Sequence, residues 1–87
     1  MVLKFGGDDF EPQNLMTCRS RKSDGTERLY TVWLDDTQIG TTYGHHDHVI
    51  VINLFGYGYY IFGYEELMNR MMKSMTLNDL LAMGQKV

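Results

Sequence analysis

Residues 49–64 read VIVINLFGYGYYIFGY, and this stretch decides the fold of the chain. It opens with β-branched residues, apolar on both faces, which is typical of a buried central strand over residues 49–55. Residues 55–64 hold more than half of the chain's aromatic residues, interrupted by three glycines. We expect Gly56-Tyr57-Gly58 to turn the chain and residues 59–62 to return as a further strand. One segment therefore supplies both core and aromatic surface.

Shorter strands are predicted before this stretch. Residues 1–5 favour an edge strand that Gly6-Gly7 would end. Residues 15–21 and 27–34 predict a hairpin, because Asp24-Gly25 between them tolerates the positive φ of a tight turn. In its second arm Trp33 falls on a partly covered second face. Residues 38–43 predict a short strand, and residues 44–48 a polar loop.

After Gly63 the spacing of apolar residues changes from that of a strand to that of a helix. Apolar residues then recur at helical spacing, namely Tyr64, Leu67, Met68, Met71, Met72 and Met75. A second helix is predicted from Thr76 as N-cap and Asp79 as its capping-box partner, with Gly84 in the C′ position. Strands first and helices last indicate an α+β fold, with a small antiparallel sheet of four to five strands and two C-terminal helices on one face. The 87 residues form a single domain, 1–87.

Composition limits the class of protein. The hydrophobic and charged fractions, 44% and 22%, are those of a folded chain. The net charge of −3 argues against a general nucleic-acid binder and is too small for a DNA mimic. Cys18 is the single cysteine, so no internal disulfide forms. Without a signal peptide or a long apolar run, we expect a cytoplasmic protein of a bacterium or a host cell.

The histidines are gathered in one place, as His45, His46 and His48. In an extended segment His46 and His48 share a side, close enough to hold one metal ion. A metal site needs further ligands that only folding could bring, so a plain polar loop is the competing interpretation. Adjacent imidazoles also predict sensitivity to acid between about pH 5 and 7. A metal- or pH-responsive binding protein is therefore one alternative function.

A second alternative is a small sheet that binds RNA or single-stranded DNA. Arg19, Arg21 and Arg28 lie on the predicted hairpin, and Tyr57 and Tyr59 lie on the aromatic stretch. Arginines of this kind meet phosphates while tyrosine rings stack on bases. The acidic net charge weighs against this alternative.

No nucleophile motif, P-loop or dinucleotide fingerprint is present, so neither an enzyme nor a cofactor is predicted. Tyr, Met and Trp exceed what a small core hides, which indicates a protein-binding module. Its partner-binding residues are predicted to be Trp33, Tyr57, Tyr59, Tyr60, Arg19 and Arg21. Such a module occludes a larger protein or complex, and a phage- or mobile-element-encoded inhibitor of host defence fits this character. The methionine-rich helix offers a possible homodimer surface, although a core role is the stronger interpretation.

Overall fold

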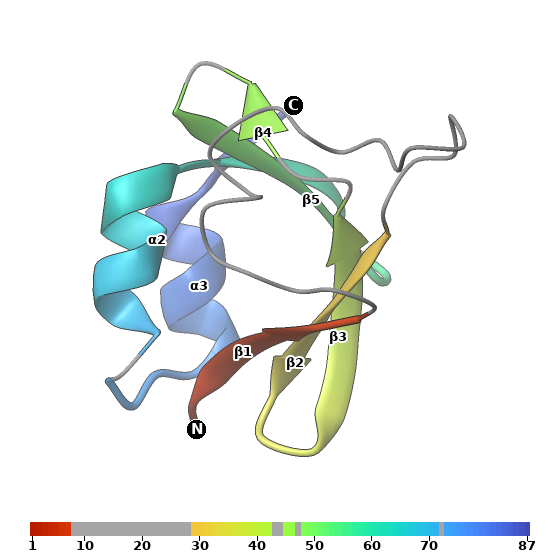
Figure 1. Cartoon of the computed structure of the whole chain (residues 1–87), viewed down its shortest axis with the longest axis vertical. Coiled ribbons are helices and arrows are strands. Elements are labelled where there is room, and N and C mark those ends of the chain that lie inside the picture. The colour runs from red at the N-terminus through yellow and green to blue at the C-terminus, as the bar shows by residue number, and fades with distance from the viewer. Residues whose placement is uncertain (8–28, 43–44, 47, 72) are drawn as a thin grey trace.

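Among the described residues, seven strands form one antiparallel sheet in the computed structural model of the chain (Figure 1). The structure describes residues 1–7, 29–42, 45–46, 48–71 and 73–87, with the backbone alone at 45–46. The strands are β1 (Leu3–Gly6), β2 (Tyr30–Leu34), β3 (Thr37–Thr42), β4 (His45–His46), β5 (Val49–Leu54), β6 (Gly58–Gly63) and β7 (Gln85–Lys86). Helices α2 (Tyr64–Arg70) and α3 (Leu77–Met83) lie between β6 and β7 in the sequence.

The strand order is β1-β2-β3-β5-β6-β7, and β4 pairs with β5. This order follows the sequence, so the sheet is a meander. Short turns join β2 to β3 and β5 to β6, whereas the two helices connect β6 to β7. The predicted α+β class is confirmed, as is the edge position of the first strand. The sheet has more than the expected four to five strands because β4 and β7, two residues each, escape a search for alternating patterns.

The helices cover one face of the sheet, as predicted (Figure 1). We call this the inner face. Alternate residues of the central strands point into it and are buried, namely Tyr30, Val32, Leu34, Ile50, Ile52 and Leu54. Leu67 of α2 and Leu80 of α3 are buried in the same core. The expectation that residues 49–55 are buried on both faces is wrong, because Val51 points away from the helices and is 39% exposed.

The helix predicted from Tyr64 onward is formed but is shorter than expected. Helix α2 ends at Arg70, with Met71 as its C-cap. The Met71 N–H bonds the Met68 carbonyl, and the Lys73 N–H bonds the Arg70 carbonyl. Both hydrogen bonds span three residues, as in a 3₁₀-helix, rather than the four of an α-helix. Met75 lies beyond, buried in the core. Of the described methionines expected on this helix, only Met68 lies within it, and Met72 lies outside the described residues.

Helix α3 begins as predicted. The Asp79 N–H donates to the Thr76 hydroxyl (3.1 Å), and the Thr76 N–H donates to the Asp79 carboxylate (2.9 Å). The hydrogen bond from the Thr76 N–H foremost, and the Thr76 hydroxyl after it, lower the pKa of the Asp79 carboxyl group. Gly84 ends the helix, but with an extended backbone at φ −87° rather than the expected left-handed one. Glycine is needed there for space, since a Cβ would lie 2.5 Å from the ring of Phe62.

The first two residues hold two loops together at one end of the sheet. The Val2 N–H donates to the Asp35 carboxylate (2.8 Å), and the Asp35 N–H donates back to the Val2 carbonyl (2.9 Å). The Met75 N–H donates to the Met1 carbonyl (2.7 Å). The turn between β2 and β3 and the connection between the helices are thus fixed by the same segment.

Part of the predicted hairpin lies outside the described residues, namely residues 15–21 and the turn at Asp24-Gly25. Its second arm is shorter than expected, since Leu29 precedes the strand and β2 starts at Tyr30. That strand pairs with β1 on one side and with β3 on the other. No helix in the described part of the chain is long and apolar enough to cross a membrane.

Candidate functional site

Among the described residues, the most exposed cluster of aromatic side chains lies at the turn between β5 and β6. Phe55 and Tyr57 lie in the turn and are 48% and 44% exposed. Tyr59, the second residue of β6, is 58% exposed. We call these three residues the hairpin tip. Large rings held in solvent by a short turn are typical of residues that anchor a partner.

The glycines on either side of Tyr57 shape this turn. Gly56 has φ +83° and Gly58 has φ +94°, values that residues with a Cβ rarely adopt. A positive φ at Gly56 is what a type II turn requires at its third residue, and the Tyr57 N–H closes the turn on the Leu54 carbonyl (2.9 Å). The Phe55 N–H bonds the Ile39 carbonyl of β3. The tip is therefore held in place by hydrogen bonds to the sheet.

A second apolar surface is the face of the sheet that the helices leave uncovered. We call it the outer face. Strand pairing aligns its residues across the sheet: Val51 lies beside Ile61, Asn53 beside both Thr41 and Tyr59, and Thr31 beside Thr41. Valine at the centre of such a face, rather than a charged residue, is unusual for a surface in contact with water.

The predicted partner-binding residues do not form one cluster. Tyr57 and Tyr59 share the hairpin tip, whereas Trp33 lies on β2, three strand spacings or about 14 Å from β6. Tyr60 lies on the inner face, where it is half-buried and its ring stacks on Phe62 at a centroid distance of 6.5 Å. Arg19, Arg21 and Arg28 lie outside the described residues.

Phe55 and Val51 are exposed apolar residues that the sequence analysis missed. Both were assigned to a strand buried on its two faces. Asn53 was the only sign that alternate positions of this strand meet water, and a single asparagine does not identify a face.

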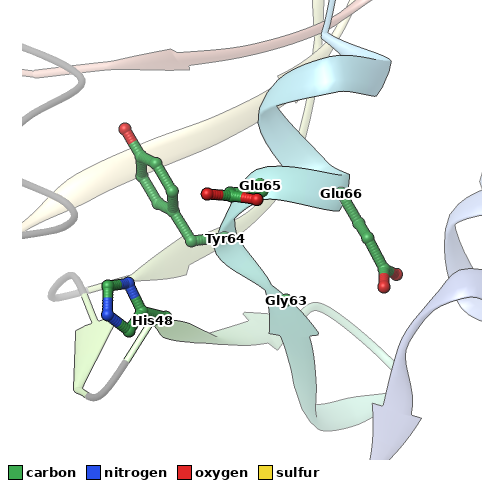
Figure 2. A pocket seen from close by; sticks show the side chains of 5 residues that line it. All are labelled: His48, Gly63, Tyr64, Glu65 and Glu66. Atoms are coloured by element: carbon green, nitrogen blue, oxygen red, sulfur yellow. The ribbon is translucent and has the colours of Figure 1, made fainter.

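An open pocket of about 370 Å³ lies where β5 begins and α2 starts. Its lining is His48, Gly63, Tyr64, Glu65 and Glu66. Figure 2 shows Tyr64 and Glu65 on the same side of the first helical turn as His48, while Glu66 points to the other side. The Tyr64 N–H donates to the His48 carbonyl (2.8 Å), which ties the helix start to this corner. Carboxylates at a helix start are favoured by the helix dipole.

The histidine segment differs from its prediction. His45 and His46 form β4, which pairs with Ile50 and Val49, so the chain reverses between His46 and β5. The extended segment on which His46 and His48 would share a side does not exist, and His48 takes φ +63° in the reversal. The side chains of His45 and His46 lie outside the described residues. Within the described part of the chain, no three His, Cys, Asp or Glu side chains gather as metal ligands do.

Comparison with known proteins adds no family to this geometry. No protein-family model matches the chain, no curated protein is similar to it, and no solved structure matches its fold. The two exposed apolar surfaces and the polar pocket are therefore interpreted from their own residues.

Proposed function

We propose that this chain is a non-enzymatic protein-binding module that uses the hairpin tip to occupy a pocket or cleft of a larger protein. The exposure of Phe55, Tyr57 and Tyr59 on a fixed turn carries the proposal. Rings held by a rigid turn lose little conformational freedom on binding. The free energy gained by burying them is therefore offset little by the cost of ordering them. Tyrosine is also among the residues most often found at binding hot spots.

The mechanism is steric occlusion. The tip enters the partner's pocket while the sheet behind it blocks access to the partner's own substrate or subunit. An inhibitor of this kind needs no reacting groups. A phage- or mobile-element-encoded inhibitor of a host enzyme or defence complex has this size and character, and the cytoplasm is where it would meet such a target.

The test is a capture experiment from cell lysate, with the chain immobilised and the retained proteins identified by mass spectrometry. It is run with and without nuclease and EDTA, on the native chain and on the double variant Tyr57→Ser/Tyr59→Ser. We expect one large protein to be retained under every treatment, and its affinity for the purified double variant to fall by at least about tenfold.

Leu29→Ser is the matched control, because Leu29 is 48% exposed, like Phe55, but lies just before β2. It should bind as the native chain does, and both variants should melt at the native temperature. Equal affinity of the double variant would contradict the proposal. Loss of the partner with nuclease would favour nucleic acid, and loss with EDTA would favour the histidine segment.

A further inference from the structure

Lys86 of β7 is a charged side chain that lies next to the hairpin tip. It is paired with Tyr60 across the β6–β7 ladder. A Cβ placed on Gly58 would lie 3.9 Å from the Lys86 Cε, so the lysine side chain leans along β6 toward the turn. Its ammonium group therefore ends near Gly58, the residue between Tyr57 and Tyr59.

Backbone pairing fixes Lys86 relative to the tip. The Val87 N–H donates to the Tyr59 carbonyl (3.0 Å), so the chain on either side of Lys86 is bonded to β6. The Lys86 side chain is exposed, and no carboxylate of the described residues forms an ion pair with it. Its ammonium group is therefore held at the tip and available to a partner.

No carboxylate side chain lies near the tip among the described residues. Those of β3, and of the continuous stretch from Val49 to Gly63, include no Asp, Glu, Lys or Arg. The carboxylate of Asp36 is three residues, or about 10 Å, from Ile39, whose carbonyl bonds the Phe55 N–H. Physiological salt screens exposed charges beyond about 8 Å. Lys86 is thus the charged side chain that a partner of the tip meets, although the chain has a net charge of −3.

We propose that the pocket that receives the hairpin tip carries a carboxylate side chain at its rim, which pairs with Lys86. This inference rests on the proposed function, because it concerns the same partner. The rings enter the apolar part of the pocket, while Lys86, on the same side of the sheet as Tyr60, stays at the edge of the contact. One lysine is too little for a nucleic acid, whose backbone is held by several cations. The partner is therefore a protein with an apolar cleft and an acidic edge.

Rates of binding to the purified partner from the capture experiment test the proposal. Charges at the rim of an interface act chiefly on the association rate and on its salt dependence, whereas buried anchors act on dissociation. Association of the native chain should therefore slow as salt is raised. Lys86→Glu should associate about three- to tenfold more slowly at low salt, with most of the salt dependence lost.

Lys73→Glu is the matched control, because it makes the same change in net charge at another exposed lysine. Lys73 lies in the connection between α2 and α3, which is bonded to Met1 beside β1, at the opposite edge of the sheet from β7. This control should associate as the native chain does. Lys86→Gln, which removes the charge without reversing it, should fall between the native chain and Lys86→Glu. All three variants should melt at the native temperature.

The tip variant separates this proposal from the proposed function. If Tyr57→Ser/Tyr59→Ser binds weakly while Lys86→Glu associates as fast as Lys73→Glu, the acidic rim is refuted and binding through the tip stands. If the double tip variant binds as tightly as the native chain, or if no partner is retained, both proposals fail.

Discussion

On β5, Ile50, Ile52 and Leu54 are fully buried beneath the helices, whereas Val51 on the same strand is more than one-third exposed. The two faces are built from neighbouring residues of similar size and hydrophobicity. They differ because α2 and α3 follow β6 and fold back over one side only. A strand whose residues are apolar on both sides therefore does not indicate which side the chain itself covers.

Truncating a side chain of β5 on the inner face and one on the outer face gives the largest expected difference in the free energy of unfolding. Ile52→Ala should lower the free energy of unfolding by about 3 kcal/mol, because it removes a buried side chain and leaves a cavity under the helices. Val51→Ala should cost less than about 1 kcal/mol. Urea denaturation measures both. Equal losses would mean that the chain covers both faces.

Gly84 tests how closely the helix layer approaches the inner face. Gly84→Ala should destabilise the fold by about 1–3 kcal/mol, because the new methyl group would lie 2.5–2.7 Å from ring atoms of Phe62. The neighbouring Gln85→Ala, at an exposed position of β7, is the control and should change stability by less than about 0.5 kcal/mol. Thermal unfolding of both variants measures the difference, and a neutral Gly84→Ala would show that the ring can move aside.

The smallest expected effect concerns the start of α3 and depends on pH. Folding lowers the pKa of Asp79 below its ordinary value of 3.8, so the contribution of the Asp79 carboxylate to stability is present above that value and is lost as the pH falls through the folded pKa. Asp79→Asn should melt below the native chain at pH 7, and the two melting temperatures should converge as the pH falls below the folded pKa of Asp79. A difference that persists in acid would assign the effect to the helix cap's shape rather than to its charge.

The sequence predicted the antiparallel sheet, the helices on one face and the Thr76 cap, because alternation, helical period and capping chemistry are local signals. It did not predict where α2 ends. Met71 and Met75 continue the helical spacing, but hydrogen bonds to Arg70 and to Met1 take the backbone out of the helix. Strands of two residues, such as β4 and β7, have no pattern of their own and exist only through pairing.

The candidate site was predicted in part. Tyr57 and Tyr59 were expected at a surface and lie there together. Tyr60 was grouped with them, but strand alternation turns adjacent residues to opposite faces, and the register of the turn decides which one meets solvent. Trp33 shares the outer face with Tyr59 and is separated from it by two strands, a separation that depends on strand order rather than on any residue.

The meander has a consequence for how the chain folds. Each pairing from β2 to β6 joins strands that are close in sequence, with only the two-residue β4 between β3 and β5, so residues 30–63 can assemble through short loop closures. Strands β1 and β7 occupy the two opposite edges and close longer loops, so we expect them to add to a preformed ladder. Loss of β1 or β7 would therefore leave the remaining strands paired with one another. Amide protons of β5 and β6 should therefore exchange most slowly, with those of β1 and β7 opening first in events smaller than global unfolding.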